Sequence, residues 1–334
     1  MITTLKNIKI TAISSALPNN CISVFDYCNN LLSEREAKRL TKNTGFEKLC
    51  ITDNTMTTAD LCFAAGEHIF NSTDIKKDDI DGIVFVSQTP DYILPATSHV
   101  LQNRFGLKTD IFAIDINQGC SGYVYGLNVA SQLVSTEQCK KVLLCAGDTI
   151  SKLTNESDRA SRTIFGDGAS ATIIEKGTEK LFFNFKTFGE RAKAIIVANS
   201  SNKKEEKTNL DGYLALDGMS IMNFTLDEVP ANIEELLAQA NVDKLAIDKY
   251  VMHQANKLII NSLADKLSID SEKIPFIANN IGNTSSASIP LVLSGLADNK
   301  VLKQVVLCGF GVGLSIASVI TNLSDTKLLQ TVRI

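Results

Sequence analysis

The sequence predicts an α/β protein in which parallel sheets are covered by helices on both faces. The first observation is that apolar runs of strand length, rich in β-branched residues, alternate with amphipathic helix patterns along the 334 residues. The second is composition: 44% of the residues are hydrophobic and 21% charged, so the chain can bury a large core. The third is a faint internal repeat. Strands that alternate with helices are typical of parallel sheets with helices on each face.

Each predicted element has the period and length of its type. Apolar runs rich in Val and Ile predict strands at residues 8–13, 80–86, 111–116, 142–146, 171–174, 194–197, 249–252, 305–308 and 314–320. Apolar residues at helical spacing predict helices at residues 58–70, 98–105, 122–134, 226–240, 257–267 and 288–296. Residues 200–209, with three lysines and two glutamates, are the most polar segment and predict an exposed loop.

The internal repeat suggests two similar halves. IDGIV at residues 80–84 resembles IDKYV at 247–251, and VLLCA at 142–146 resembles VVLCG at 305–309. The two offsets, 167 and 163 residues, are close to one another. We therefore predict a division near residue 176, into residues 1–176 and 177–334.

Charge and hydropathy exclude several classes of partner. The net charge is −4 and the lysines are scattered, so no basic surface for nucleic acid is expected. Residues 1–17 have only short apolar runs, broken by Lys6, Asn7 and Lys9, and so do not form a signal peptide. No stretch approaches the ~18 apolar residues that a membrane span needs. The expected partners include neither nucleic acid nor membrane.

The cysteines suggest a reducing compartment. There are eight, at positions 21, 28, 50, 62, 120, 139, 145 and 308, and no two form a Cys-x-x-Cys pair. In a long chain without a secretion signal, this pattern predicts reduced thiols in the cytoplasm. Most of them are expected to be small buried hydrophobic residues.

Cys120 is the candidate nucleophile. It lies where the strand pattern 111–116 meets the helix pattern 122–134. Gly119 and Gly122 permit a sharp strand-to-helix turn that lifts the side chain out of the sheet, as in a nucleophile elbow. The electropositive end of a helix favours thiolate over thiol. The alternative is an ordinary buried cysteine at the end of a strand.

His253 and Asn283 are the candidate partners of Cys120. His253 follows the strand pattern 249–252 directly, at the carboxyl end where open α/β sheets build their sites. Asn283, between Gly282 and Thr284, can donate a hydrogen bond to a developing negative charge. The alternatives are a core histidine and a turn asparagine.

A third element is the run CGFGVGLS at residues 308–315, in which three glycines alternate between two apolar strands. A dinucleotide site would need the glycines to open a helix, whereas here they lead into a strand pattern. A tight turn whose backbone N–H groups face a pocket is the better interpretation.

Five motifs in order give the chain a family resemblance: GCSG at 119–122, FGDGA at 165–169, HQAN at 253–256, GNTS at 282–285 and GFGVG at 309–313. With them the chain resembles ketoacyl-acyl-carrier-protein synthase III, of the thiolase superfamily, over nearly its whole length. The resemblance implies a thiolase-like five-layered αβαβα fold built from two similar βαβαβαββ halves. Residues 1–176 would carry the nucleophilic cysteine, and residues 177–334 the histidine and asparagine. It also implies a homodimer without a cofactor or a metal.

The resemblance implies a decarboxylating Claisen condensation in fatty acid or specialised acyl biosynthesis. Cys120 would take an acyl group from a thioester. Malonyl-acyl-carrier protein would then lose carbon dioxide, and donors from His253 Nε2 and Asn283 would stabilise the enolate. The backbone N–H groups of Cys120 and Val312 would hold the oxyanion of the condensation step. The product would be a 3-oxoacyl-acyl-carrier protein.

The resemblance also assigns substrate contacts. Phe310 would shape the acyl pocket, and Leu94 would reach the acyl pocket of the partner subunit. Many relatives clasp the adenine of coenzyme A with a tryptophan and an arginine before a Thr-Gly pair, whereas this chain has no tryptophan and carries Arg39 and Asn43 there. A carrier-protein donor is therefore an alternative to acyl-coenzyme A. The residues implied in binding either one are Arg39, Asn43, Arg159, Asn256, Lys257 and Lys266. For the two lysines, the alternative is a solvated helix face.

Three other functions are weighed against condensation. A thiolase would need a second catalytic cysteine in Cys-x-Gly-x-Gly, but Cys308 lies one residue too early, and this shift turns a strand side chain to the opposite face. An acyltransferase would pass the acyl group from Cys120 to an alcohol or amine without decarboxylation. A non-catalytic subunit would commonly lose the nucleophile, which this chain retains.

Overall fold

The computed structural model describes residues 1–297 and 302–334. The strands are β1 (Ile2–Leu17), β2 (Cys21–Ser23), β3 (Lys48–Cys50), β4 (Gly82–Val86), β5 (Phe112–Ile116), β6 (Lys141–Asp148), β7 (Gly168–Thr187), β8 (Ile195–Val197), β9 (Leu214–Leu216), β10 (Lys249–Met252), β11 (Val305–Gly311), β12 (Ser315–Thr321), β13 (Lys327–Leu328) and β14 (Val332–Arg333). The α-helices are α1 (Val24–Tyr27), α2 (Glu34–Thr44), α3 (Thr58–Ser72), α4 (Thr97–Phe105), α5 (Gly122–Ser135), α6 (Arg159–Arg162), α7 (Gly218–Ala240), α8 (Lys257–Leu267) and α9 (Ser288–Gly295). Short 3-10 helices are η1 (Lys77–Asp79), η2 (Ile150–Leu153), η3 (Gly189–Ala194), η4 (Lys244–Ala246), η5 (Ser271–Lys273), η6 (Ala278–Asn280) and η7 (Ser285–Ala287).

The main strands hydrogen-bond in the order β10-β11-β12-β7-β6-β4-β5, and β1 runs along β7 with β13 and β14 on its other side. The pairs β4–β5, β4–β6 and β10–β11 are parallel, whereas β12 and β7 are antiparallel to their neighbours. The prediction of purely parallel sheets is therefore wrong at the centre. There, β11 and β12 are joined by the short turn 312–314 rather than by a helix, and a short turn can join only antiparallel strands.

The long strand β7 connects the strands around β6 with those around β12. Residues 168–175 of β7 pair with β6, and residues 182–187 pair with β12. β1 runs antiparallel along both stretches, with register shifts between Lys6 and Ala12. The division predicted near residue 176 falls inside β7 and stays a prediction.

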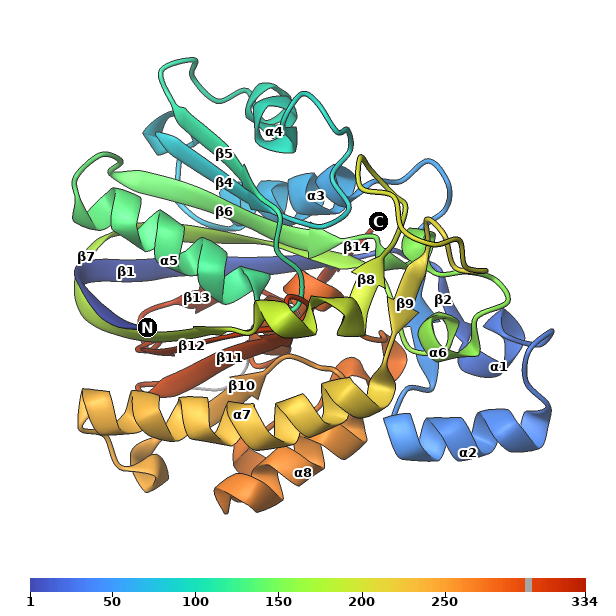
Figure 1. Ribbon diagram of the computed structural model, residues 1–334. Coiled ribbons are helices and arrows are strands. Elements are labelled where there is room, and N and C mark those ends of the chain that lie inside the picture. The colour runs from blue at the N-terminus through green and yellow to red at the C-terminus, as the bar shows by residue number, and fades with distance from the viewer. Residues whose placement is uncertain (298–301) are drawn as a thin grey trace.

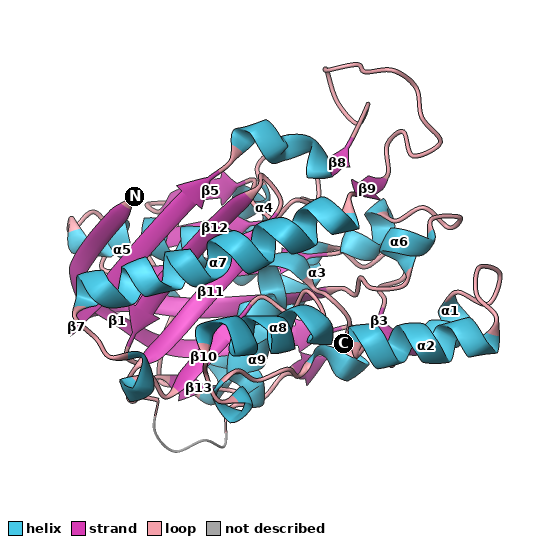
Figure 2. Cartoon of the chain, turned by 60° about the horizontal axis from the view of Figure 1, so that its bottom comes forward, coloured by secondary structure: helices cyan, strands magenta, loops and turns pink. Residues whose placement is uncertain are grey.

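Alternate residues along the strands face different helix layers, as the two-residue period of a strand requires. Val305 and Leu307 belong to a central core that contains α5 and α9 residues, whereas Val306 packs with α7 and α8. On the other side, Val84 faces the central core and Phe85 packs with α3 and α4. Figure 1 shows α3 and α4 at the top beyond β4 and β5, and α7 and α8 at the bottom beyond β10 and β11, with α5 between; Figure 2 shows α7 and α8 lying across the strands from the lower side. The five-layered αβαβα fold is confirmed.

Every strand and helix expected from periodicity is present, and residues 200–209 lie in the loop between β8 and β9, as predicted. The sequence analysis missed α2, whose sequence EREAKRLTKNT is polar and has Ala37 as its buried residue. Its start carries a capping box, in which the Ser33 hydroxyl accepts from the Glu36 N–H and the Glu36 carboxylate accepts from the Ser33 N–H. That Ser-x-x-Glu signal could have predicted the helix.

The cysteine prediction needs one correction. β2 and β3 place Cys21 directly opposite Cys50, and these two residues form a disulfide. The expectation that all eight cysteines are reduced thiols is therefore wrong for this pair. Pairing of two short strands brought the residues together, and a separation of 29 residues in the sequence gives no sign of it. Among the described residues, no helix is both long and apolar enough to cross a membrane.

Candidate active site

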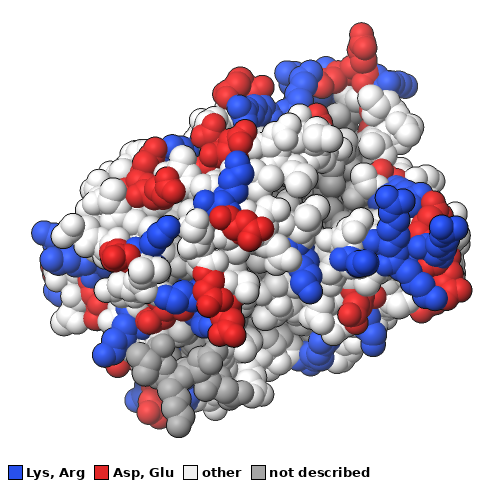
Figure 3. Space-filling model, turned by 90° about the horizontal axis from the view of Figure 1, so that it is seen from below, with Lys and Arg blue, Asp and Glu red and all other residues white. Residues whose placement is uncertain are grey.

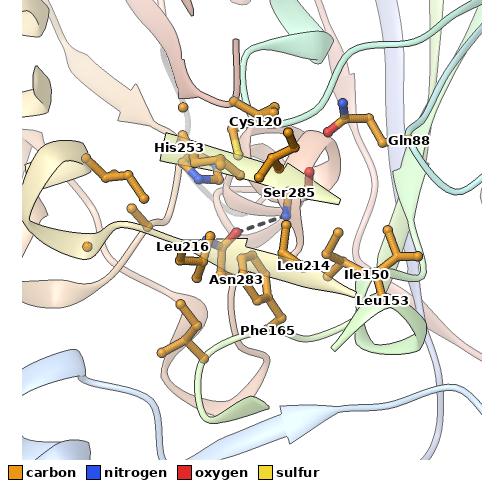
Figure 4. Close-up of a pocket in the computed structure, with 18 of the residues that line it drawn as sticks. Gln88, Cys120, Ile150, Leu153, Phe165, Leu214, Leu216, His253, Asn283 and Ser285 are labelled. Atoms are coloured by element: carbon orange, nitrogen blue, oxygen red, sulfur yellow. Dashed lines mark hydrogen bonds between the residues drawn. The ribbon is translucent and has the colours of Figure 1, made fainter. Parts of the chain in front are cut away.

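A cavity of about 530 Å³ brings Cys120, His253 and Asn283 together. Cys120 lies between β5 and α5, His253 directly follows β10, and Asn283 lies between η6 and η7. Figure 4 shows the three side chains around one part of the cavity, with the sulfur of Cys120 beside the His253 ring. Residues separated by up to 163 positions in the sequence thus meet in one site.

The turn that carries Cys120 is tightly fixed. The Gly122 N–H donates to the Gly119 carbonyl at 2.6 Å. A Cβ on Gly119 would lie 2.2 Å from Gln88 Oε1 and 2.6 Å from Val312 Cγ1, so a larger residue would force these side chains to move. The hydroxyls of Ser121 and Ser315 are 2.8 Å apart, which fastens the turn to the start of β12. The sharp strand-to-helix turn predicted from the glycines is present.

The Cys120 sulfur is a thiol in the resting site. Burial raises its pKa to about 11, and the Asp148 carboxylate acts in the same direction. The Val312 N–H, the Ser285 hydroxyl and the Cys120 N–H lower the pKa but do not outweigh burial. The expectation of a resting thiolate is therefore wrong, because the packed atoms around this half-buried side chain penalise the charged form more than the three donors stabilise it.

His253 is neutral at pH 7. Its side chain is 1% exposed, and burial lowers its pKa to about 4. The backbone N–H of His253 donates to the Cys308 backbone carbonyl at 2.8 Å, which continues the pairing of β10 with β11. The Phe310 ring packs edge-on to the imidazole at 5.5 Å between centroids. Nδ1 lies 2.6 Å from the Ser288 hydroxyl.

Asn283 is held by both its backbone and its side chain. Its backbone N–H donates to the Ile164 carbonyl, and its backbone carbonyl accepts from the Gly166 N–H. Its Oδ1 accepts from the Ser285 N–H at 3.0 Å, the bond drawn as a dashed line in Figure 4. Because Oδ1 is engaged in this way, Nδ2 is the atom left to donate to a bound group.

The glycine turn after β11 packs directly on Cys120. A Cβ on Gly311 would lie 2.8 Å from the Cys120 sulfur, and one on Gly309 would lie 2.7 Å from the Cys120 carbonyl oxygen. Cys308 packs instead with the α7 and α8 core, on the other face of β11. The cysteine position that a thiolase would use is thus occupied by Gly309, as the register argument predicted.

Apolar side chains line the rest of the cavity. Leu214 and Leu216 of β9, with Ile195 of β8, form part of one wall, and Ile150 and Phe165 form another. The sequence analysis did not assign these residues to the site, and it missed β9 altogether because three residues are too few to leave a periodic signal. An apolar cavity of this kind accepts an acyl chain.

Asp148 is a buried carboxylate that sequence reasoning also missed. Its Oδ1 accepts from the Gln88 N–H at 2.7 Å and from the Ser87 hydroxyl at 3.1 Å. Its Oδ2 accepts from the Ser286 N–H and hydroxyl, at 3.1 and 2.7 Å. The carboxylate therefore ties the segment after Asn283 to the loop after β4. Its signal, a single Asp after an apolar strand, is too common to stand out.

Of the other predicted contact residues, the uncharged ones differ in whether they line the cavity. Phe310, Val312 and Asn256 line the cavity. Leu94 is 80% exposed and outside the cavity lining of its own chain, so its place in a partner's pocket stays a prediction.

The charged candidates lie on the surface. Arg39 and Asn43 are exposed on α2, and Lys257 is exposed at the start of α8. Arg159 pairs with Glu36 at 2.9 Å, and Lys266 pairs with Asp227 at 3.8 Å.

Two family profiles match the chain. The profile described as 3-oxoacyl-[acyl-carrier-protein (ACP)] synthase III matches residues 114–189, which contain Cys120. The profile for the C-terminal part of the same enzymes matches residues 237–323, which contain His253 and Asn283.

Full-length relatives and solved structures agree with these profiles. The beta-ketoacyl-[acyl-carrier-protein] synthase III of Lactobacillus helveticus is 30% identical, and the match covers 94% of this chain and 98% of the relative. That of Streptococcus agalactiae is 32% identical, covering 94% and 99%. The crystal structure of a 3-oxoacyl-(acyl-carrier protein) synthase from Burkholderia xenovorans has a TM-score of 0.96 at 32% identity, covering 100% of this chain and 99% of that one. The synthase III from Thermus thermophilus has a TM-score of 0.85 at 27% identity, covering 94% and 98%.

Proposed function

Because the chain belongs to the 3-oxoacyl-[acyl-carrier-protein] synthase III family, we infer that it catalyses the decarboxylating condensation of an acyl thioester with malonyl-acyl-carrier protein. The observation that carries this function is the meeting of Cys120, His253 and Asn283 at one apolar cavity. A nucleophile, an imidazole and a carboxamide donor are the groups that covalent acyl transfer and enolate stabilisation require.

In the first half-reaction, Cys120 Sγ attacks the carbonyl carbon of the acyl thioester and loses its proton. The carbon–sulfur bond of the thioester breaks, and the leaving thiolate takes up a proton to depart as a thiol. The N–H groups of Cys120 and Val312, both of which lower the pKa of the Cys120 thiol, are the proposed donors to the tetrahedral oxyanion. The acyl chain then occupies the apolar part of the cavity beside Phe310.

In the second half-reaction, the carbon–carbon bond to the malonyl carboxylate breaks and carbon dioxide leaves. The electron pair passes into the thioester carbonyl as an enolate, to which Asn283 Nδ2 and a protonated His253 Nε2 donate. The enolate carbon attacks the acyl carbon on Cys120, and the sulfur leaves and is protonated. One proton is consumed in this half-reaction.

We propose that the carrier protein binds over α2 and the start of α8. Lysines and arginines gather at the end of the face in Figure 3 where Figure 1 places α2. Four of them, Arg35, Lys38, Arg39 and Lys42, are exposed at helical spacing on one side of α2. The stem of Lys257 packs on Gly45 at the end of that helix, and Asn256 beside it lines the cavity. A negatively charged partner suits this surface.

Arg159, held to α2 through Glu36, is the proposed contact for a coenzyme A donor. Lys266, about 14 Å along α8 from Lys257 at 1.5 Å per residue, would meet the outer edge of a bound carrier protein. We further propose that the enzyme works in the cytoplasm as a homodimer. A reducing compartment would keep the Cys120 thiol free to accept an acyl group, and it would also open the Cys21–Cys50 disulfide, which lies outside the cavity lining.

Intact-mass measurement tests the function. Wild type is incubated with a panel of acyl-coenzyme A and acyl-carrier thioesters, and then with malonyl-carrier protein. We expect one acyl adduct, absent from Cys120→Ser, and carbon dioxide release that depends on Asn283. Cys308→Ala is the matched control, and it should keep both activities because Cys308 faces the α7 and α8 core. An adduct without carbon dioxide from any primer would indicate acyl transfer without decarboxylation, and loss of activity in Cys308→Ala would favour a thiolase.

A further inference from the structure

The imidazole of His253 is the first member of a buried hydrogen-bonded chain. Nδ1 lies 2.6 Å from the Ser288 hydroxyl, and that hydroxyl donates to the Ser285 carbonyl, also at 2.6 Å. All three residues are at most 2% exposed. Ser285 has a φ of +51°, in the left-handed region that residues other than glycine rarely occupy. That conformation directs its N–H to Asn283 and its carbonyl to Ser288.

The donors and acceptors in this series of hydrogen bonds determine which tautomer the His253 ring adopts. A carbonyl only accepts, so the one hydroxyl proton of Ser288 is used on Ser285. Toward His253 the hydroxyl can therefore only accept, and Nδ1 must carry a proton. Turning the hydroxyl toward Nδ1 would leave the hydroxyl and carbonyl oxygens 2.6 Å apart with no proton between them, which is an unfavourable contact even though the Ser288 backbone N–H also donates to this carbonyl.

We propose that Ser288 is a positioning residue that holds His253 as the Nδ1–H tautomer, so that Nε2 enters each half-reaction as a proton acceptor. The consequences for catalysis rest on the proposed function, whereas the tautomer itself does not. The ring is uncharged at rest because burial disfavours its protonation. Its bare nitrogen then faces the cavity that also contains the Cys120 thiol.

This form of the ring balances the protons of both half-reactions. During acylation, Nε2 takes the proton from Cys120 Sγ and returns it to the sulfur of the leaving thiol. During condensation, Nε2 takes a proton from solvent when the malonyl carboxylate binds, because a nearby negative charge favours the imidazolium. That N–H donates to the enolate oxygen, and the proton then passes to the departing Cys120 sulfur. The ring ends each half-reaction as it began.

The charged and titratable surroundings fit this assignment. Cys120 faces the cavity from the turn before α5, and its raised pKa keeps it a thiol that has a proton to give. Cys308 on β11 binds the His253 backbone through its carbonyl, and burial raises the pKa of its own thiol. Asp148, at the end of β6, is engaged by Gln88 and Ser286 and acts on Cys120.

NMR of ¹⁵N-histidine-labelled protein tests the tautomer without reference to activity. The chain has three histidines, and His253→Gln assigns the signal. We expect wild type to show Nδ1–H over Nε2–H by about ten to one or more, because the other form loses the hydroxyl–carbonyl hydrogen bond and leaves the two oxygens 2.6 Å apart. Ser288→Ala should raise the Nε2–H fraction, and Ser288→Thr, which keeps the hydroxyl, should restore the wild-type ratio. A wild-type ring protonated at Nε2 overturns the proposal.

Kinetics provide the second readout. We expect Ser288→Ala to slow acylation of Cys120 at least about tenfold, because the ring loses part of its action as a base. The decline of condensation rate with rising pH, which proton uptake by Nε2 produces in wild type, should flatten. Ser294→Ala is the matched control, since it removes another buried serine of α9, whose hydroxyl contacts Ser15. Equal losses in both half-reactions with an unchanged pH profile overturn the proposal, whereas a wild type that neither acylates nor condenses overturns the proposed function instead.

Discussion

At the scale of single residues, the site is built from neutral groups. Burial raises the pKa of Cys120 and lowers that of His253, so thiol and imidazole face the same cavity uncharged at pH 7. A neutral thiol and imidazole react when a substrate carbonyl carbon lies where the sulfur can attack it. A resting thiolate would be open to any electrophile that diffused into the cavity.

The first prediction concerns the reactivity of Cys120. At pH 7 a thiol with a pKa near 11 is about 0.01% ionised, so iodoacetamide should label Cys120 at least tenfold more slowly than it labels the unfolded chain. The sign follows from the raised pKa: the labelling rate should keep increasing from pH 7 to pH 10 without a plateau. Quenched-flow labelling with mass spectrometry measures the rate, and Cys120→Ser supplies the blank. A plateau below pH 8 would contradict the raised pKa.

The identities of the key residues could be read from the sequence, but their protonation could not. Cys120, His253 and Asn283 each lie in a short motif at the end of a predicted strand or in a glycine turn. The pKa of Cys120 depends instead on how completely distant residues such as Gly311 and Val312 cover it, which is a property of packing. The role of Ser288 could not be predicted for the same reason. Residues 285–288 are Ser-Ser-Ala-Ser, and nothing in that run shows which serine contacts a histidine.

At the scale of elements, the register of β11 decides which residues reach the site. Gly309 and Gly311 point toward Cys120 while Cys308 points to the opposite layer, so the absence of side chains at the two glycines makes room for the nucleophile turn. Strand periodicity in the sequence predicted this arrangement. Of the two short strands that complete the cavity, β8 was predicted, whereas β9 was missed because its three residues are too few to show a period.

The second prediction concerns this close approach. Gly311→Ala places a Cβ 2.8 Å from the Cys120 sulfur at a φ of +148°, where side chains are strained. We expect Cys120 to be displaced and its acylation slowed about 100-fold, as misplacement near 1 Å commonly does. Single-turnover intact-mass measurement gives the rate. Gly189→Ala, where an added Cβ meets nothing within 4 Å, should react like wild type. A normal rate in Gly311→Ala would show that the turn yields without affecting the nucleophile.

At the scale of the whole molecule, β5 is the outer strand of the sheet in the described residues, and Ile114 on it is 37% exposed. In the loop between β4 and α4, Tyr92, Ile93 and Leu94 are 58%, 95% and 80% exposed. An open edge strand and exposed large apolar side chains are features of an interface. They support the proposed homodimer, in which Leu94 would reach the second copy.

The third prediction concerns assembly. Wild type should have twice the 36.3 kDa chain mass in light scattering, and Ile114→Lys should shift it toward the single-chain mass because a charge at the edge opposes pairing. Leu245→Lys is the matched control, since Leu245 is 72% exposed on η4 and outside the proposed interface. A wild-type mass of one chain would reject the homodimer. Sequence periodicity predicted sheets with helices on both faces, and the family resemblance implied the five layers, but neither reveals which edge remains open.

The pairing of β1 with β13 and β14 has a consequence for how the protein is made. The Asn19 N–H donates to the Ile334 carbonyl, and Leu329, Val332 and Ile334 pack against the α3 and α4 core. On the ribosome, residues 2–17 are therefore translated more than 300 residues before the segment that covers them. A nascent chain of this enzyme would keep part of its first core open to chaperones until translation nears its end, even though most strands of that core emerge early.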